Sequence, residues 1–495
     1  MVSLACAALL AATGLLLAAE ATEEKELGDG WVAVYLKEQR IGYVHTHALQ
    51  RGEGAQALFA TETEQHISVT RGQTTTAVTM RSEVVEDRKG RLVSFKNVLE
   101  QGRVRQTASG EVKEGKLVLQ TGAGDASQTR TVDVPDALCP WAATLVAKAW
   151  GYKDGTAYSL SLFMPESPEK AVTASVTIGD AEPQQVFEVT KWLHRAEMTL
   201  SSMPDAKMVQ WVDDEGTPWL ARMRFGLLEI EMRKVPKEVA LQPPENVEMM
   251  LSCGIAPDHP IDRPRTLESL QLLLEAEGKD VKLDLPAGPY QEVTKREGGV
   301  ELKLRRAHGD PARSYRLPYA QEEHADLLKA TPWLEIQSPL IVQMSKEAVG
   351  DETDALKAAR RIERYVGEQI KEKTLGLGFA TAAETARQKA GDCTEHAVLA
   401  AALARAAGIP SRVAVGLAYA GPMPPDKEAK FYYHMWTELY VGEWLPLDAT
   451  LGSHDATHIA LASNALDKQG SLFELSGPVL RFIGAVRIKV LKVGE

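Results

Sequence analysis

The stretch KAGDCTEHAVLAAALARAAGIPSR constrains the fold of this 495-residue chain more than any other segment. Asp392 and Glu395 form a D-x-x-E arrangement, in which each side chain accepts a hydrogen bond from a backbone N–H at the start of a helix. The alanine-rich run that follows favours helix, Gly408 suits the position just after a helix, and Pro410 prevents continuation. The sequence therefore predicts a helix that begins at Cys393 and ends before Gly408.

Cys393 occupies the first position of this predicted helix, where backbone N–H groups have no carbonyl partner within the helix. The helix dipole and these N–H groups favour a thiolate over a thiol, and they can also bind the oxyanion formed at an attacked carbonyl. The alternative is a small buried side chain, since free cysteines are among the most buried residues. A nucleophile also needs a base and a residue that orients the base.

The sequence after this helix supplies a histidine and a carboxylate on neighbouring strands. We expect a strand in RVAVGLAYA, a loop in GPMPPDKEAK and a β-hairpin in FYYHMWTELYVGEWLPLDAT, with its turn near Gly442 and Glu443. Folding this hairpin places His434 almost directly opposite Asp448, within a residue of register. A cysteine at a helix start, then a strand histidine, then an aspartate on the next strand is the layout of nucleophile, base and orienting acid.

Four motifs in this region resemble the core of the transglutaminase-like superfamily, whose fold is related to that of papain-like cysteine proteases. The motifs are GDCTEHA, LAAALARAAGIPSR, YYHMWTELYV and WLPLDAT, and the resemblance covers residues 340–462. It implies that Cys393 is the nucleophile, His434 the base and Asp448 the orienting acid. The sequence contains no acidic loop that would imply calcium, and we expect no cofactor and no metal ion.

The tryptophans near these motifs are expected to be structural. Trp436 and Trp444 should pack the hairpin rather than bind substrate. Larger animal members of the superfamily carry a tryptophan that helps to bind the oxyanion, but Trp333 lies two predicted helices upstream of Cys393 and does not match it. The second oxyanion donor is therefore not assigned from the sequence.

Several histidines offer alternatives that we weigh against packing roles. His396 lies one turn into the predicted helix, within reach of the thiol, but a structural role is favoured. His454 and His458 have the spacing of two metal ligands on a helix, and His45 and His47 lie two apart on one strand face. Neither pair has a third ligand in view, so packing is favoured over metal binding at both places.

The region from Trp31 to about Val235 alternates polar and apolar residues in short runs that end at glycine-containing turns. Examples are GYVHTHALQ, EDRKGRLVSF, EVKEGKLVLQ and VDDEGTPWLARMRF. Alternation with a period of two and turns at this spacing predict an antiparallel sheet. Similar turns near Gly90 and Gly216 suggest a duplicated module, and CPWAATLVAKAWGY between them predicts one helix.

The chain between this region and the motifs is mixed. PKEVALQPPENVE is expected to be a linker, TLESLQLLLEAEG a helix and YQEVTKREGGVELKLRR a strand hairpin. TDALKAARRIERYVGEQI has apolar residues at helical spacing and predicts an amphipathic helix. A second, short helix is expected from Ala382 to Lys389.

The net charge and the N-terminal sequence indicate which partners and which cellular location to expect. The formal charge of −12 would repel phosphate backbones, so we expect no nucleic-acid partner. The apolar run from Leu4 to Ala19 suits a secretory signal rather than a membrane span, and the letters AEA at its end offer a cleavage site. We expect export to the periplasm or the extracellular space. An uncleaved anchor is the alternative, because the first three residues include no Lys or Arg.

Removal of the N-terminal segment leaves three cysteines, Cys139, Cys253 and Cys393. In an oxidising compartment Cys139 and Cys253 could form a disulfide, which would leave Cys393 as the odd thiol. Two ordinary buried thiols are the favoured alternative to that bridge.

Together these patterns predict an α+β protein, with β-rich N-terminal modules followed by a papain-like, transglutaminase-like catalytic domain. The predicted parts are a signal peptide at 1–21, β-rich modules at 28–240, a mixed segment at 250–340, the catalytic domain at 341–465 and a C-terminal strand extension at 466–495.

The expected activity is acyl transfer from a peptide or glutamine amide through a thioester on Cys393. Water is favoured as the second nucleophile, which would make the protein a peptidase or amidase. Two alternatives stay open: a cross-linking transglutaminase, in which an amine resolves the thioester, and a catalytically inactive binding or scaffold protein of the cell envelope. The expected partners are a peptide or protein substrate and envelope components bound through the β-rich region.

Overall fold

The structure is a computed structural model that describes residues 24–494 apart from short gaps. The gaps are residues 37, 72–73, 102–103, 124–125, 188, 226–227, 246–253, 278–282, 373–379, 423–426, 468–474, 476–477, 480–481 and 483. The predicted signal peptide at 1–21, Cys253 and part of the proline-rich loop before His434 lie outside the described residues. Within the described ranges, no helix is both long enough and apolar enough to cross a membrane.

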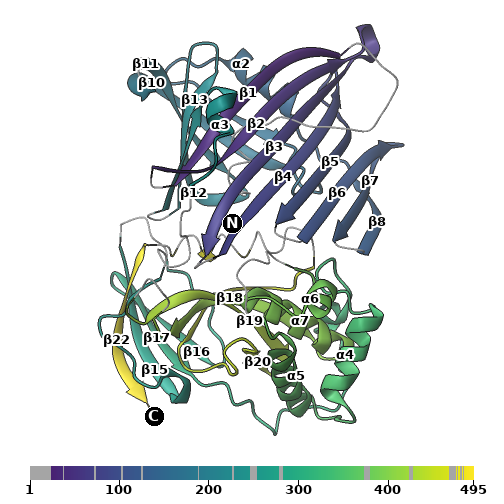
Figure 1. The fold of residues 1–495 in the computed structure, drawn as a ribbon, viewed down its shortest axis with the longest axis vertical. Helices are drawn as coiled ribbons and strands as arrows, with labels where there is room; N and C mark the ends of the chain where they lie inside the picture. The colour runs from purple at the N-terminus through teal and green to yellow at the C-terminus, as the bar shows by residue number, and fades with distance from the viewer. Residues whose placement is uncertain are drawn as a thin grey trace. The chain divides into compact units, whose positions relative to one another are not determined.

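The chain divides into two compact units, one formed by residues up to 247 and one formed mainly by residues 248–495. The described residues of the first unit form one antiparallel sheet of 14 strands in the order β8-β7-β6-β5-β4-β3-β2-β1-β14-β13-β12-β11-β10-β9 (Figure 1). The two ends of the region therefore pair with each other through β1 and β14. The strands are β1 (Glu24–Leu36), β2 (Gln39–Arg51), β3 (Leu58–Arg71), β4 (Thr74–Asp87), β5 (Leu92–Gln101), β6 (Val104–Lys113), β7 (Lys116–Ala123), β8 (Ala126–Asp133), β9 (Ala157–Leu162), β10 (Val172–Val186), β11 (Val189–Leu200), β12 (Met203–Val212), β13 (Pro218–Phe225) and β14 (Leu228–Lys234).

The antiparallel sheet predicted for this region is confirmed. Which side chains of a strand are buried follows from their alternation between the two faces of the sheet. Because successive side chains of a strand point to opposite faces, one face of β10 is buried while the other is exposed. The turns predicted at Gly90 and Gly216 have φ values of 75° and 79°, which glycine adopts without strain. The buried residues of β10 are Val172, Ala174, Val176, Ile178 and Val186.

Helix α2 (Pro140–Trp150) confirms the helix predicted within this region, and Cys139 directly precedes it. The Cys139 side chain does not cap the helix. Instead, the Glu86 carboxylate of β4 accepts the backbone N–H of Trp141 at 3.0 Å and that of Ala142 at 2.8 Å. Cys139 is fully buried in a hydrophobic cluster whose other members include Phe95, Leu117 and Phe163.

The described residues of the second unit form two four-stranded antiparallel sheets. In the first, with the order β16-β17-β15-β22, the C-terminal strand β22 pairs with β15 of the mixed segment. The second, with the order β20-β19-β18-β21, carries the sequence motifs. The strands are β15 (Ser269–Ala276), β16 (Gln291–Arg296), β17 (Gly299–Arg305), β18 (Ser411–Ala420), β19 (Lys430–Tyr440), β20 (Trp444–Leu447), β21 (His458–Asn464) and β22 (Val486–Gly494).

Strand β15 shows that the helix predicted in TLESLQLLLEAEG is wrong. Leu270, Leu272 and Leu274 are fully buried and alternate with partly exposed residues, which is the period of a strand. The strand pairs with β17 on one side and β22 on the other. This pairing overrides the helix propensity of leucine. The strand hairpin predicted in the same segment is confirmed as β16 and β17.

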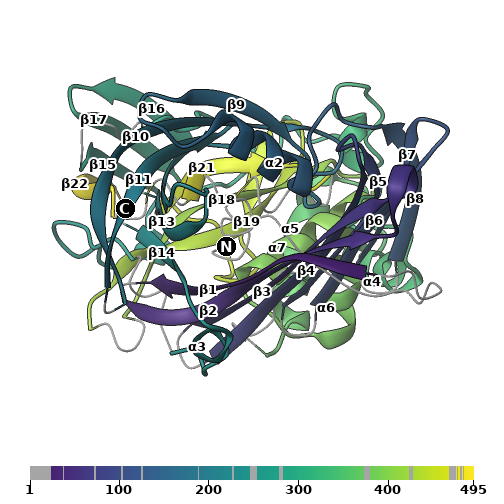
Figure 2. The same ribbon diagram turned by 90° about the horizontal axis from the view of Figure 1, so that it is seen from above.

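Four helices lie with the second sheet. Three of them, α5, α6 and α7, confirm helices predicted from the sequence, and α4 was not predicted. Helix α7 packs against β18 and β19, and α4, α5 and α6 surround it (Figure 2). Six of the 14 residues of α7 are alanine, and small side chains let neighbouring elements pack close to a helix backbone. The helices are α4 (Pro339–Val349), α5 (Ala355–Gln369), α6 (Ala382–Gln388) and α7 (Cys393–Ala406).

Candidate active site

Helix α7 begins at Cys393, as the sequence predicts, and its neighbours hold the first turn. Asp392 Oδ1 accepts the backbone N–H of Thr394 at 2.8 Å, and Glu395 Oε2 accepts the backbone N–H of Asp392 at 2.9 Å. Glu395 Oε1 accepts the backbone N–H of Ala380 at 3.1 Å. Burial, together with the charge of Asp392, raises the pKa of the Glu395 carboxyl. The Cys393 side chain, fixed at this helix start, stays partly exposed.

His434 lies on β19, where it pairs with Gly416 of β18 in the register of the sheet. A side chain at Gly416 has no room, because its Cβ would lie 1.9 Å from the backbone oxygen of Ile459 and 2.7 Å from the Trp436 ring. The glycine lets β21 and Trp436 come close to the strand that carries His434. The His434 side chain is only 10% exposed.

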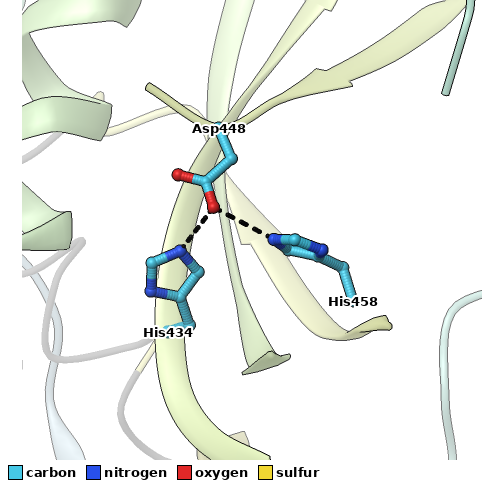
Figure 3. Close-up of side chains that lie close together, drawn as sticks. All are labelled: His434, Asp448 and His458. Atoms are coloured by element: carbon cyan, nitrogen blue, oxygen red, sulfur yellow. Dashed lines mark hydrogen bonds and ion pairs between the residues drawn. The ribbon is translucent and has the colours of Figure 1, made fainter. Parts of the chain in front are cut away.

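His434 and Asp448 are in direct contact (Figure 3). Nε2 of His434 lies 2.8 Å from Oδ2 of Asp448. An ionised carboxylate only accepts hydrogen bonds, so Nε2 carries the hydrogen and a neutral His434 has its lone pair on Nδ1. His434 also forms a hydrogen bond with the Cys393 side chain, for which Nδ1 is the remaining nitrogen. The structure thus brings the three predicted residues together in the order Cys393, His434, Asp448.

The charges around His434 favour the imidazolium form. Burial lowers the pKa of His434, but the Asp448 carboxylate and the charge of Cys393 raise it by more, to about 9. Burial also opposes ionisation of Asp448, yet His434 and His458 hold the pKa of that carboxyl well below its usual value. At neutral pH the site therefore contains a paired imidazolium and carboxylate.

The register of the hairpin differs slightly from the sequence prediction. Leu447, the last residue of β20, pairs with Thr437. The next residue, Asp448, therefore lies opposite Trp436 of β19. His434 lies two residues farther along β19, and the two side chains therefore meet diagonally rather than directly across the strands.

The loop after β20 and helix α5 anchor Asp448. Its Oδ1 accepts the backbone N–H of Thr450 at 2.8 Å and that of Leu451 at 3.2 Å. Its own backbone N–H donates to Glu363 Oε1 at 2.9 Å. Glu363 is held in turn by Arg360, at 2.9 Å. Asp448 is 1% exposed, so these contacts replace nearly all of its hydration.

A second histidine, His458, contacts the same carboxylate oxygen as His434 (Figure 3). Its Nε2 lies 3.0 Å from Asp448 Oδ2, and its side chain is fully buried. The helical spacing inferred for His454 and His458 is wrong, since His458 begins β21 and His454 lies in the loop before it. The sequence carried no signal for this contact, because the pairing of β21 with β18 joins segments that no local pattern connects.

The atoms of His434, Asp448 and His458 also form a set that could hold a metal ion, since they lie within 4.8 Å of one another. The same atoms fit a hydrogen-bonded site. Both imidazoles direct Nε2 at one oxygen of Asp448, and the other oxygen accepts two backbone N–H groups. The expectation that no metal binds here stays a prediction, which elemental analysis of the purified protein tests.

The two tryptophans of the hairpin make packing contacts. Trp436 is 1% exposed, and its ring meets those of His454 and His458 edge to face, at 5.6 and 5.3 Å between centroids. Trp444 lies under the guanidinium of Arg412, 4.0 Å from the ring centroid. These contacts support the structural roles expected for both tryptophans.

His396 and Trp333 also lie near the start of α7 and α6. His396 is buried, and its Nδ1 lies 2.6 Å from the backbone oxygen of Asp392, which supports the structural role expected for it. The backbone oxygen of Trp333 accepts the N–H of Ala382 at 3.0 Å. Trp333 is therefore adjacent to α6 in space, although the three helices α4, α5 and α6 separate it from Cys393 in the sequence.

His45 and His47 lie on one face of β2, as the sequence predicts, and both contact carboxylates. Nε2 of His45 is 2.5 Å from Oδ1 of Asp29. His47 lies 3.2 Å from Glu26 through Nε2 and 3.5 Å from Glu62 through Nδ1. These pairs account for both imidazoles without a metal ion.

Comparison with known proteins supports the resemblance read from the motifs. Residues 342–449 match the family model described as the transglutaminase-like superfamily, and this segment includes Cys393, His434 and Asp448. The C-terminal domain is therefore transglutaminase-like, and it follows a β-rich N-terminal region. No curated protein matches the chain at a significant level.

Two solved structures are similar to parts of the chain. One, from Cytophaga hutchinsonii, is described as a "Putative Cysteine Protease"; it has 14% identity and a TM-score of 0.29, and the match covers 45% of this chain and 82% of that one. The other is a beta-barrel-like protein with a domain of unknown function from Brucella abortus. It has 14% identity and a TM-score of 0.30, and the match covers 43% of this chain and 96% of that one.

Proposed function

We propose that the transglutaminase-like domain is a cysteine enzyme, which transfers an acyl group from a peptide or glutamine amide to Cys393 and then to water. The observation that carries the proposal is the placement of His434, which donates through Nε2 to Asp448 and is left with Nδ1 for the Cys393 thiol. A buried imidazole held charged by two anions is costly to desolvate, and a packing role does not require it.

The first half of the reaction uses Cys393 and His434. At neutral pH Nδ1 of the His434 imidazolium already holds the thiol proton, and the Cys393 thiolate attacks the amide carbonyl carbon. The carbonyl electron pair moves to the oxygen, which the backbone N–H of Cys393 stabilises, since the N–H groups of Thr394 and Glu395 donate to Asp392. When the C–N bond breaks, the imidazolium returns the proton to the departing nitrogen. An amine leaves, and the acyl group remains on Cys393 Sγ as a thioester.

The second half uses the same base. Nδ1 of His434 takes a proton from water, and the oxygen attacks the thioester carbonyl carbon. The C–S bond breaks, the acid is released and the thiolate is restored beside the imidazolium. Asp448 exchanges no proton in either half. It keeps the hydrogen on Nε2 and so keeps Nδ1 available to Cys393.

Trapping of the thioester tests this proposal. Purified protein is mixed with peptide and glutamine amide substrates, quenched in acid and digested, and the peptide containing Cys393 is examined by mass spectrometry. We expect an acyl adduct that Cys393→Ala lacks. If Cys393 is alkylated normally by iodoacetamide but never forms an adduct, the domain is instead a binding or scaffold protein.

Water is the favoured acceptor of the acyl group. Transfer to an amine requires a thioester shielded from water, which is present at about 55 M and otherwise wins. A labelled primary amine at millimolar concentration, supplied with an acyl donor, measures the partition. We expect mostly free acid, and predominant incorporation of the amine would make the protein a cross-linking enzyme that uses the same three residues.

Export and envelope partners form the last part of the proposal. The apolar run and the AEA letters at the N-terminus support cleavage near residues 19–21 and a periplasmic or extracellular location. Envelope components are proposed as partners of the β-rich region. Intact-mass analysis of protein from its own host tests the cleavage, and a soluble cytoplasmic form that retains residues 1–19 would contradict it.

A further inference from the structure

We propose that His458 is a positioning residue of this site, which together with Asp455 and Arg265 holds Asp448 in place and sets the charge that acts on His434. The inference rests on the function proposed above. His458 lies beyond residue 449, where the match to the family model ends. Arg265 comes from the mixed segment before the motifs, to which the sequence assigned no chemistry.

His458 lies between two carboxylates. Its Nε2 is 3.0 Å from Asp448 Oδ2, and its Nδ1 is 3.3 Å from Asp455 Oδ1 and 3.2 Å from the Asp455 backbone oxygen. Asp455 forms an ion pair with Arg265 and accepts both the backbone N–H and the hydroxyl of Thr457, at 2.8 and 2.6 Å. Nε2 of His458 faces an acceptor, while Nδ1 faces the two acceptor oxygens of Asp455 and one donor, the backbone N–H of Asp455 at 3.3 Å. The surplus of acceptors over donors suits the doubly protonated imidazolium.

The side chains form a row of alternating charge in which Asp455, His458 and Asp448 are buried. Burial lowers the pKa of His458, but hydrogen bonds to Asp448 and Asp455 raise it to about 9, so it is cationic at neutral pH. Burial opposes ionisation of Asp455 as well, yet His458 and Arg265 keep its pKa far below the usual value. Charges of alternating sign compensate one another where an isolated buried charge would not persist. The row runs from Arg265 through Asp455, His458, Asp448 and His434 to Cys393.

The first consequence concerns the orientation of Asp448. A carboxylate has about four acceptor positions. Two backbone N–H groups occupy Oδ1, and the two imidazoles share Oδ2. With all four positions filled, the carboxylate cannot rotate without breaking several bonds. Removal of the His458 donor leaves Oδ2 with His434 alone.

The second consequence concerns the charge at His434. The two imidazole rings are 5.8 Å apart between centroids, so the His458 cation opposes part of the attraction that Asp448 exerts on the His434 proton. Removal of that cation should raise the pKa of His434. The charged or titratable groups that face this pair are Asp448, Asp455, Cys393, His454, Arg265, Arg360 and Glu363.

The chain offers a matched control in His454. It is buried in the loop before His458, its ring lies 4.2 Å from that of His458, and it also packs on Trp436. Burial and the His458 cation hold the pKa of His454 well below its usual value, so it is neutral. Replacing His454 therefore changes the packing beside His458 without removing a charge or a donor to Asp448.

The experiment compares full-length wild type with three variants: His458→Gln, His458→Leu and His454→Leu. Histidines are labelled with ¹³C at Cε1, and NMR spectra follow each imidazole with pH, with His434 and His458 assigned from variants that lack them. Glutamine keeps an N–H donor near Asp448 but no charge, and leucine keeps neither. Alkylation of Cys393 by iodoacetamide at pH 6 is measured on the same samples.

We expect His458 of the wild type to be protonated at pH 7. His458→Gln should raise the His434 midpoint by about one pH unit and keep the alkylation rate within about threefold, whereas His458→Leu should also lower that rate about tenfold or more. His454→Leu should change neither quantity.

A neutral His458 in the wild type at pH 7 would overturn the proposal, and that measurement needs no variant to fold. So would a His434 midpoint that moves no more in His458→Gln than in His454→Leu. If the expected shifts occur but no substrate forms a thioester, the inference about His458 holds and the proposed enzyme activity fails.

Discussion

The chain places a cysteine at the start of a helix in each of its two units, and the two sites have opposite chemistry. Cys139 directly precedes α2 in the first unit, and Cys393 begins α7 in the second. From the helix dipole alone, both thiols would be expected to ionise readily. The difference between the two thiols therefore shows which features, beyond the start of a helix, decide how readily a cysteine ionises.

At Cys139 the end of the helix is already occupied by an acid. Both oxygens of Glu86 accept backbone N–H groups of the first turn of α2, so the positive end of the dipole acts on that carboxylate. Burial, reinforced by the charge of Glu86, raises the pKa of the Cys139 thiol far above its usual range. Cys139 is therefore an inert, buried thiol.

At Cys393 a base stands beside the thiol. Asp392 caps this helix start by accepting the N–H of Thr394 and that of Glu395, and His434 forms a hydrogen bond with the Cys393 side chain. The imidazolium of His434 stabilises a neighbouring thiolate directly. From this comparison we expect the imidazole and its carboxylate, more than the helix start, to decide the reactivity of Cys393.

Exchanging each cysteine for alanine should give the largest contrast. Cys393→Ala should abolish thioester formation and lower turnover by about 10⁵-fold or more, because no other group can form the covalent bond. Cys139→Ala should leave turnover unchanged and lower the free energy of unfolding by about 1–3 kcal/mol through loss of buried contacts. Steady-state kinetics and denaturant unfolding measure the two effects. Loss of turnover in a folded Cys139→Ala protein would refute the contrast.

The next prediction compares the loss of the base, His434, with the loss of its orienting acid, Asp448. His434→Ala should reduce turnover almost as far as Cys393→Ala, since nucleophile and base act as a unit. Asp448→Asn should retain about 10²-fold more activity than His434→Ala, because the orienting acid contributes less alone. His396→Ala is the control, since His396 is buried beside the same helix start, with its Nδ1 at the Asp392 backbone oxygen. If His396→Ala lost more turnover than His434→Ala, the base would be wrongly assigned.

Local chemistry explains why so much of this site could be predicted from the sequence. The capping residues Asp392 and Glu395 mark the start of α7, and a single hairpin brings His434 near Asp448. Both features depend on residues close together in the chain. The predicted register of the hairpin was wrong by two residues. His434 and Asp448 still meet, because side chains on neighbouring strands can also contact each other along the diagonal.

The parts that could not be predicted depend on pairing between distant segments. His458 reaches Asp448 only because β21 pairs with β18, and Arg265 reaches Asp455 from a segment nearly 200 residues earlier. The same cause explains the error at β15, whose leucines form a strand because β22 from the end of the chain pairs with it. Periodicity reports the local backbone, and it contains no information about such partners.

The alkylation rates of the two cysteines at mildly acidic pH should also differ, by a smaller factor than the turnover rates of their alanine variants. At pH 6 iodoacetamide should modify Cys393 about 10²–10³-fold faster than Cys139, since only Cys393 has an imidazolium beside it and a partly exposed side chain. Peptide mapping by mass spectrometry gives both rates in one sample. The alkylation rate of Cys393 should also fall sharply in His434→Ala. Equal rates for the two cysteines, or a rate for Cys393 like that of free cysteine from pH 5 to pH 8, would contradict the role of His434.

The smallest effect should come from Glu86, the acid that occupies the start of α2. Burial raises the pKa of Glu86 to about 7, against hydrogen bonds from Ala142 and Trp141 that lower it. Because the folded carboxyl binds its proton more tightly than the unfolded one, its stabilising contribution is complete below about pH 4.5. That contribution declines as the pH rises toward 7.

Glu86→Gln removes this titration while keeping one oxygen that can accept an N–H of α2. Relative to the variant, the wild type should lose about 3 kcal/mol of unfolding free energy between pH 4.5 and pH 7.5. Denaturant unfolding of both proteins across that range measures the difference in their unfolding free energies. The contributions of all other titrating groups are the same in both proteins and cancel in this difference. Turnover at the Cys393 site should be the same in both proteins at every pH, because Glu86 acts on a thiol that takes no part in the reaction. Parallel stability curves for the two proteins would mean that the folded and unfolded carboxyls of Glu86 bind their proton equally, which would contradict a pKa raised by burial.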